Sequence, residues 1–329
     1  MTDVSRRESL LTLASLFAGL VPLAARGQSV LPNKTIRLLV GFMGGGGTDI
    51  LARSIASQLQ RRSGRNVMVE NRPGENGAIP GELVKKSPPD GANLAFLAST
   101  TLVSRLATND FPFDPLTDLS SVTLAGNFPI GLAVSRRTGV STFPEYLEWL
   151  KSGDDTRRRL GNTASAAFIQ VFSLLIGRVI GASFETVTYR GAVPMVNDLE
   201  EGRLPAAASG LPSLLAGHRG GRLKLLMVSG AKRLRVAPDI PTAAELGYPD
   251  LQMTEWFGVF AAPRTPVAII EEWNRQFHHV LADRNVIDEF AHLGVEAESS
   301  TPQEMVARIE EHMKSWRARM EMVGLKPAN

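Results

Sequence analysis

The sequence predicts an α/β fold made of two units, and three observations lead to this prediction. The chain has 329 residues, which is more than one ordinary core needs and suits two domains. Short apolar runs alternate with stretches of helical periodicity, a pattern typical of parallel sheets covered by helices. The alternation starts again after residue 130, without a repeat of fixed period. An apolar content of 43% and a charged content of 21% are those of a globular protein.

The first unit begins with a predicted buried strand over 36–42, because this run is almost entirely apolar. Four glycines follow, and we expect Thr48 to cap a helix whose apolar residues recur at helical spacing. The rest of the unit is predicted as a second strand over 66–70, a Pro/Gly loop over 71–77, a helix over 78–87 and a third strand over 92–99. This order predicts neighbouring parallel strands with helices on both faces.

The second unit shows the same pattern. Strands are expected over 131–135, 186–189, 203–209, 222–229 and 256–263. Helices are expected to begin after Thr142, near Ala166 and after Ala192. The C-terminal region is predicted to be helical over 267–284 and again from Thr301, where Thr-Pro-Gln-Glu forms a capping box. We interpret the apolar stripes of these last helices as core contacts.

Residues 1–27 have the order of a secretory signal peptide. An arginine pair, Arg6 and Arg7, precedes the apolar run 10–25, and small residues before Gln28 offer a cleavage site. The pair resembles a twin-arginine export signal. The alternative is a membrane anchor, but the apolar run is shorter than the ~20 residues that span a bilayer. We therefore predict an exported, periplasmic protein.

Charge and composition exclude several classes of function. Loss of residues 1–27 removes three arginines and two carboxylates, so the net charge falls from +3 to +2. Such a mild charge argues against nucleic-acid binding. The chain has no cysteine, which rules out disulfides and cysteine-based metal sites. Its five histidines lack metal-ligand spacing, so we expect neither a metal nor a cofactor.

The four glycines at 44–47 are the most informative local feature. They lie where a strand ends and a helix begins, so backbone N–H groups and the helix dipole favour an anion there. The segment lacks the Gly-Lys-Ser/Thr of a phosphate loop and the spacing of a dinucleotide fingerprint. A purely structural turn is the alternative. Asp49 stands at the start of the helix, where it either offsets the helix dipole or contacts the ligand.

Small polar residues at the other expected strand ends complete a candidate site. Hydroxyl groups and backbone donors at helix starts suit a carboxylate without a buried Lys or Arg. The candidate ligand-binding residues are Met43, Gly44, Gly45, Gly46, Gly47, Thr48, Asp49, Ser99, Thr100, Asn162, Thr163, Ser165, Gly191, Ala192 and Ser209.

No catalytic motif is visible in the sequence. It contains neither H-E-x-x-H nor the G-x-S-x-G of a nucleophile elbow. We therefore predict that the protein is not an enzyme. The rival hypothesis is an exported hydrolase or lyase that uses Asp49, Ser209 or Glu255.

Several segments, taken together, resemble the substrate-binding proteins of tripartite tricarboxylate transporters, the Bug family. They include GFMGGGGTDILAR at 41–53, VMVENRPGENGA at 67–78, TYRGAVPMVNDLEEGRL at 188–204 and WFGVFAAPRTP at 256–266. The resemblance covers nearly the whole chain after residue 27. It implies a periplasmic-binding-protein-like (type II, Venus flytrap) fold with the ligand between two lobes.

The resemblance also implies how the chain is divided and what it does. Lobe 1 is expected over 28–130 plus 255–329, and lobe 2 over 131–254. The implied function is capture of a di- or tricarboxylate, an acidic amino acid or an aromatic acid for the permease subunits of a transporter. A ligand-presenting sensor for a membrane receptor is the alternative. We expect a monomer.

In such proteins the first glycine loop and a Tyr-Lys/Arg-Gly turn give backbone N–H groups to one ligand carboxylate. The resemblance places these at Met43–Thr48 with Asp49 and at Tyr189–Ala192, and places a serine/threonine-rich loop at 162–167. The sequence departs from the family pattern at Gly41, Met43, Gln170 and Ser209. We expect Met43, together with Phe168, to make the pocket more apolar and suited to an aromatic or bulkier acid.

Overall fold

The computed structural model describes residues 30–162, 166–189 and 191–328, and of residues 166–170 it describes only the backbone. Residues from Leu31 onward form one compact unit. Within the described ranges, every helix is too short or too polar to cross a bilayer. The predicted signal peptide lies outside these ranges, as do Thr163 and Ser165.

The first sheet has five strands in the order β2-β1-β3-β10-β4. Its strands are β1 (Ile36–Val40), β2 (Val67–Asn71), β3 (Asn93–Ala98), β4 (Ser120–Phe128) and β10 (Glu255–Ala261). Strand β1 pairs in parallel with β2 and β3, but β10 runs antiparallel to both β3 and β4. The predicted parallel pairing of the first three strands is therefore confirmed. Strand β10 can run the other way because it enters from the second sheet and not through a helical crossover.

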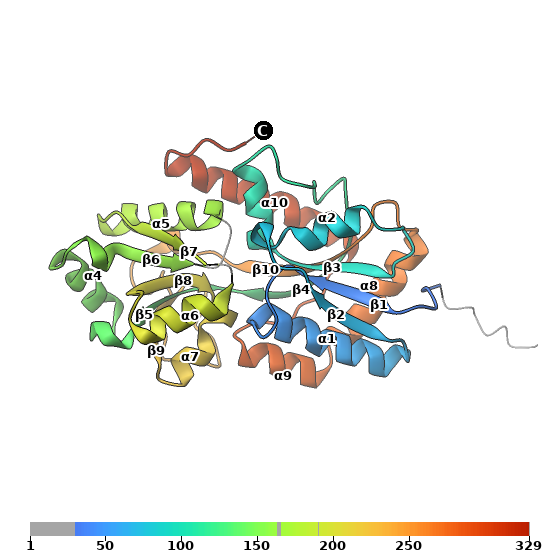
Figure 1. Cartoon of the computed structure of the whole chain (residues 1–329), viewed down its shortest axis with the longest axis horizontal. Coiled ribbons are helices and arrows are strands. Elements are labelled where there is room, and N and C mark those ends of the chain that lie inside the picture. Colours follow the sequence, from blue (N-terminus) through green and yellow to red (C-terminus); the bar gives the residue numbers. More distant parts are fainter. Residues whose placement is uncertain (1–29, 163–165, 190, 329) are drawn as a thin grey trace, which may run out of the picture. The chain divides into compact units, whose positions relative to one another are not determined.

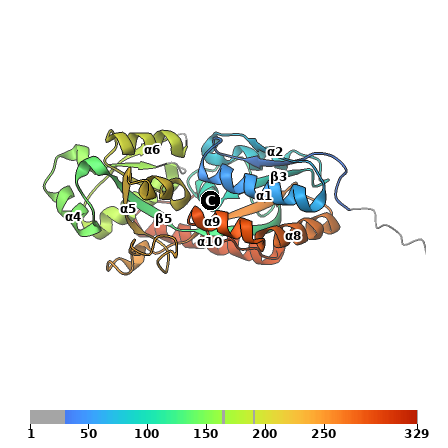
Figure 2. The same cartoon turned by 90° about the horizontal axis from the view of Figure 1, so that it is seen from below.

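Helices cover both faces of this sheet (Figures 1 and 2). On one face, α1, α8 and α9 contact one another, and on the other face α2 and α10 lie over β3, β10 and β4. The bounds of the helices of this half are α1 (Gly47–Ser63), α2 (Ile79–Lys85), α3 (Ser99–Leu102), α8 (Val267–Leu281), α9 (Arg284–His292) and α10 (Pro302–Met322).

The second sheet has the order β7-β6-β8-β5-β9, and it too is mixed. Strand β6 is parallel to β7 and β8, whereas β5 is antiparallel to β8 and β9. Helix α5 lies on one face of the sheet, and α6 and α7 on the other (Figure 1). The bounds are β5 (Ile130–Ser135), α4 (Phe143–Lys151), β6 (Arg159–Asn162), α5 (Ala166–Ile180), β7 (Glu185–Thr188), α6 (Ala192–Glu201), β8 (Ala206–Gly210), α7 (Leu215–Arg219) and β9 (Leu223–Val228).

The chain passes between the sheets twice. Strand β4 ends at Phe128 and β5 begins at Ile130, so one residue separates a strand of the first sheet from a strand of the second. The return leads from β9 to β10, which starts at Glu255. One large apolar cluster includes residues of both sheets, and a smaller cluster lies beneath α6 and α7. The two halves therefore share a continuous core beside the crossings.

Two predicted helix starts have different outcomes. The capping box is confirmed, because the Thr301 hydroxyl accepts from the Glu304 N–H and the Glu304 carboxylate accepts from the Thr301 N–H. Thr48 as a helix cap is wrong. Helix α1 begins at Gly47 and its cap is Gly46, which has extended backbone angles and no side chain to bond. Gly47, the first residue of the helix, has no Cβ and so allows Pro212 to approach closely.

Candidate functional site

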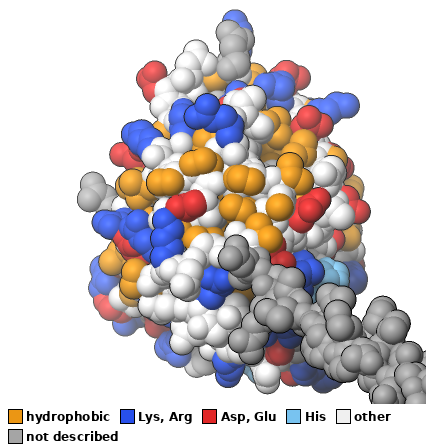
Figure 3. Space-filling model, turned by 90° about the vertical axis from the view of Figure 1, so that its right-hand side faces the viewer, with side chains coloured by type: hydrophobic (Ala, Val, Ile, Leu, Met, Phe, Trp, Pro, Cys, Tyr) orange, Lys and Arg blue, Asp and Glu red, His pale blue; other side chains and the backbone are white. Residues whose placement is uncertain are grey.

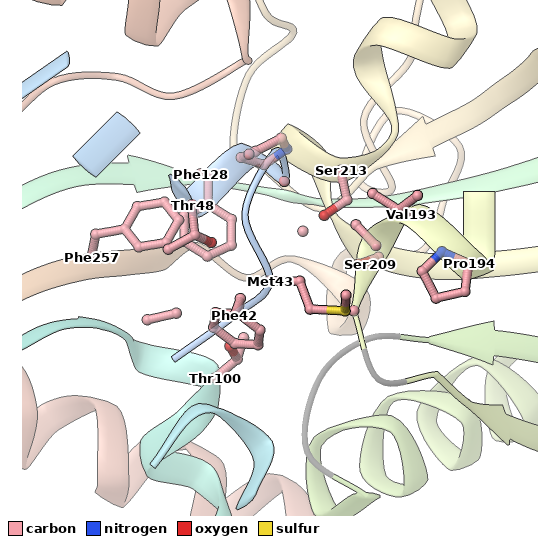
Figure 4. A pocket seen from close by; sticks show the side chains of 17 residues that line it. Phe42, Met43, Thr48, Thr100, Phe128, Val193, Pro194, Ser209, Ser213 and Phe257 are labelled. Carbon is pink, nitrogen blue, oxygen red and sulfur yellow. The ribbon is translucent and has the colours of Figure 1, made fainter. Parts of the chain in front are cut away.

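Loops from both sheets line a partly open cavity of about 60 Å³, which we call the inner cavity (Figure 4). The first sheet contributes the loop after β1, the starts of α1 and α3, and aromatic side chains of β4 and β10. The second sheet contributes the start of α6 and the segment after β8. The lining residues are Phe42, Met43, Gly46, Gly47, Thr48, Ala98, Thr100, Phe128, Gly191, Ala192, Val193, Pro194, Ser209, Gly210, Pro212, Ser213 and Phe257.

Two helices begin at the wall of the inner cavity. Residues 46–48 at the start of α1 and residues 191–193 at the start of α6 line it from opposite sides. Neither cap residue, Gly46 or Gly191, offers a side chain to the free N–H groups of the first turn. Those N–H groups and the positive ends of both helix dipoles therefore favour an anion in this region.

The rest of the wall is neutral and largely apolar. The Phe128 and Phe257 rings stack with centroids 4.5 Å apart, and Phe42 and Met43 add further apolar surface (Figure 4). Hydroxyl groups come from Thr48, Thr100, Ser209 and Ser213. Among the described lining residues there is no Lys, Arg, Asp or Glu. A ligand here would meet backbone donors and hydroxyl groups interspersed with apolar side chains.

Asp49 turns away from the inner cavity and holds the glycine loop. Its side chain is buried, and its Oδ2 accepts from the Gly45 N–H and from Arg53 Nε, both at 2.9 Å. Its Oδ1 accepts from Asn71 Nδ2 at 3.0 Å. Burial alone raises the pKa of Asp49, but the hydrogen bonds from Arg53, Gly45 and Asn71 outweigh it and hold the pKa below its usual value. The carboxylate thus positions the loop.

We expect Asp49→Asn to lower the free energy of unfolding by about 1–2 kcal/mol. The carboxylate accepts hydrogen bonds on two oxygens, whereas the amide of asparagine has only one acceptor oxygen. Since folding lowers the pKa of Asp49, its contribution is present above the pKa of the unfolded chain and is lost as pH falls through the folded pKa. Urea denaturation at pH 7 and at acid pH should show the difference between the two proteins shrinking in acid. Asp155→Asn is the control, because that side chain is 98% exposed and its ion pair contributes little. Equal stability of Asp49→Asn and Asp155→Asn at pH 7 would contradict this role.

The structure brings about half of the predicted site residues together. Met43, Gly46, Gly47, Thr48, Thr100, Gly191, Ala192 and Ser209 line the inner cavity. Gly44, Gly45, Asp49, Ser99 and Asn162 do not line it. Asn162 is fully buried at the end of β6, where its carbonyl oxygen accepts from the Tyr189 N–H. Sequence reasoning missed the aromatic wall, since Phe42 and Phe257 read as ordinary strand residues and Phe128 lies on β4, a strand that was not predicted.

Ser99 belongs to a buried polar cluster beside the second crossing. Its hydroxyl donates to Glu255 Oε2 at 2.5 Å and accepts from the Trp256 N–H at 2.9 Å. Trp316 Nε1 donates to Glu255 Oε1 at 3.2 Å, and His312 Nε2 lies 3.7 Å from Glu255 Oε2. Burial lowers the pKa of His312, partly offset by Glu255, so the ring is neutral at pH 7. This cluster ties β3, β10 and α10 together.

A second, larger space of about 750 Å³ adjoins the first and is called the outer cavity. Phe42, Met43 and Gly191 line both. The rest of its wall comes from the residue after β1, the loop after β2, the start of α2 and the end of β7: Gly41, Pro73, Gly74, Glu75, Asn76, Gly77, Ile79, Thr188 and Tyr189.

Comparison with known proteins identifies the family. Residues 51–325 match the model of the tripartite tricarboxylate transporter family receptor. The chain belongs to this family. BugT of Bordetella pertussis is 29% identical over 96% of this chain and 98% of its own length. The chain has the fold of a structure described as a periplasmic transporter, with 26% identity, 88% of this chain and 98% of the other covered, and a TM-score of 0.83.

A second solved structure, of an R. palustris protein with adipate, has 27% identity and a TM-score of 0.84. The superposition covers 90% of this chain and 99% of the R. palustris protein. The two-lobe fold expected from the sequence, and the resemblance to Bug proteins, are thereby confirmed. The receptors of this family are solute-binding proteins with a periplasmic-binding-protein fold.

The residues of the rival catalytic hypothesis lie apart within this receptor fold. Of Asp49, Ser209 and Glu255, only Ser209 lines the inner cavity. Asp49 bonds its own loop, and Glu255 is 1% exposed within the Ser99 cluster. Across the described ranges, no three His, Asp or Glu side chains gather closely enough to hold a metal ion.

On the face shown in Figure 3, Lys and Arg side chains are interspersed with Asp and Glu.

Proposed function

We propose that this chain is a periplasmic capture protein that binds a small organic carboxylate in the inner cavity and presents it to the permease subunits of a tripartite tricarboxylate-type transporter. The observation that carries the proposal is the start of two helices, α1 and α6, at one cavity whose described lining has no charged side chain. Backbone N–H groups there can solvate a carboxylate without a buried cation. The adipate found in the R. palustris relative is consistent with a carboxylate ligand.

We further propose that residues 28–130 with 255–329 form one lobe and residues 131–254 the other, with the two crossings acting as a hinge. The starts of α1 and α6 come from different sheets, so they face one ligand only when the lobes are close. A ligand that contacts both lobes stabilises the closed arrangement by its extra contacts. The closed form is then the one that a membrane partner recognises.

Thermal melting of residues 28–329 against a panel of aliphatic, amino-acid and aromatic carboxylates tests the proposal. A ligand that binds only the folded state adds about 2.7 kcal/mol at 100-fold excess over its dissociation constant, so the melting temperature rises. We expect a clear rise with carboxylates and none with their amides. Failure of every carboxylate to raise the melting temperature of a well-folded protein would refute carboxylate capture.

Gly191→Ala should reduce that rise strongly. Gly191 has φ 128°, a conformation that other residues rarely adopt, so alanine moves the N–H groups at the start of α6. The matched control is Gly139→Ala, which also has a left-handed φ, 73°, but lies in open space away from the cavity. In both variants alanine is forced into a left-handed backbone conformation, but only Gly191→Ala should bind the ligand more weakly. We expect its dissociation constant to rise by about tenfold or more, which corresponds to a loss of about 1.4 kcal/mol or more of binding free energy. Equal ligand-induced rises in the two variants would exclude the start of α6 from the site.

A further inference from the structure

Met43 lies at the boundary between the inner and outer cavities. It belongs to the lining of both, together with Phe42 and Gly191. Figure 4 shows its side chain directed from the loop after β1 toward Ser209 and Pro194. A methyl group placed on Gly191 would lie 3.8 Å from both Cγ and Sδ of Met43. The thioether therefore crosses from one half of the molecule to the start of α6 in the other.

The space on the two sides of Met43 is very unequal. The inner cavity, with the helix starts, measures about 60 Å³, whereas the outer cavity measures about 750 Å³. Because the inner cavity is the much smaller of the two, we expect a short acid to fill it. A longer acid with its carboxylate at the helix starts must pass Met43 to reach the outer cavity.

The side chain at this position is suited to such a boundary. Met43 is 49% exposed, so the core does not hold it in place. Methionine is unbranched and fills irregular gaps with little strain. Truncation to alanine removes Cγ and Sδ, the atoms that lie nearest to the Cβ position of Gly191, and we expect it to leave the backbone of the glycine loop in place.

We propose that Met43 is a specificity-determining residue that closes the inner cavity and restricts this receptor to short carboxylates, and not to the aromatic or bulkier acids that the sequence led us to expect. The inference rests on the proposed function, since it requires that the carboxylate sits at the starts of α1 and α6. Without the Met43 side chain, the two cavities join and the ligand's hydrocarbon tail extends into the outer one. Glu75 lines the outer cavity, so a tail that ends in a second carboxylate meets a like charge there.

The test is calorimetric titration of the wild type and Met43→Ala with propionate, butyrate, hexanoate, octanoate and adipate. The wild type should prefer propionate and butyrate. In the variant, hexanoate and octanoate should gain about fourfold for each additional methylene that is buried, so that octanoate gains at least tenfold relative to butyrate. Adipate should gain less than hexanoate, because of Glu75. Met68→Ala is the matched control, since Met68 is 47% exposed on β2 and lines neither cavity.

The outcomes separate the two proposals. If the wild type and Met43→Ala bind carboxylates with the same dependence on chain length, Met43 sets no specificity, while carboxylate capture stands. A wild type that already prefers octanoate to butyrate would likewise overturn the role of Met43. If neither folded protein binds any of the five acids or the wider panel, both proposals fall together. A change of chain-length preference in Met43→Ala that is absent from Met68→Ala establishes the inference.

Discussion

Replacing Gly47 with alanine is expected to weaken ligand binding by about 10- to 100-fold, through an overpacking cost of about 1–3 kcal/mol. A Cβ at Gly47 would lie 2.6 Å from Pro212 Cβ and 3.0 Å from the Pro212 carbonyl oxygen. The proline ring and its backbone cannot swing aside as a long side chain could. Gly47 begins α1 in the first half, and Pro212 follows β8 in the second, so the clash separates the two walls of the inner cavity.

The unliganded variant should melt close to the wild type, because opening the lobes relieves the clash without unfolding either sheet. The control is Gly44→Ala in the same loop, where the nearest atom to a new Cβ is Asn71 Oδ1 at an ordinary 3.6 Å. Calorimetric titration with the best acid from the melting panel measures both. Wild-type affinity in Gly47→Ala, or an equal loss in Gly44→Ala, would show that close contact between α1 and Pro212 is not needed for binding.

The strands and helices with a strong hydrophobic pattern could be predicted from the sequence. The apolar run of β1 and the capping box of α10 were recognised because local chemistry determines them. Strands β4 and β6 were missed. Strand β4 mixes small and polar residues with apolar ones (SSVTLAGNF), and β6 has four residues, RLGN, too few to show a period. Nothing in the residues of β10 reveals that it runs against its neighbours, since strand direction is decided by the path of the whole chain.

The candidate site was only partly predictable, for a similar reason. Backbone donors at a glycine-rich helix start follow from the sequence, and the structure places Gly46, Gly47 and Gly191 together at the inner cavity. The direction of a side chain at such a start does not follow from it. Ser99 and Asp49 both stand at the start of a helix, yet each side chain bonds to protein groups away from the cavity. The aromatic wall looked like core because a buried ring in a strand and a ring lining a cavity have the same sequence pattern.

Replacing Glu255 with alanine is expected to lower the free energy of unfolding by about 2–5 kcal/mol, because it truncates a fully buried side chain that accepts two hydrogen bonds. The change leaves the hydroxyl of Ser99 and the indole N–H of Trp316 without their acceptor, and it opens a cavity beside β10. Ser99, Trp316 and Glu255 are each at most 2% exposed, so water cannot easily replace the lost carboxylate. Urea denaturation at pH 7 measures the loss.

Glu255→Gln is the matched variant, since it keeps the volume and one acceptor oxygen but cannot receive both hydrogen bonds on separate oxygens. It should lose about 1–2 kcal/mol. Because Glu255 lies outside the inner cavity, the folded Glu255→Ala and Glu255→Gln proteins should bind carboxylate with nearly wild-type affinity. A loss below about 1 kcal/mol in the alanine variant would mean that the free-energy cost of burying the Glu255 carboxylate about equals the stabilisation from its hydrogen bonds. If instead the variants kept full stability but lost carboxylate binding, Glu255 would act on the ligand. That result would favour the catalytic alternative, which the burial of Glu255 beside the second crossing argues against.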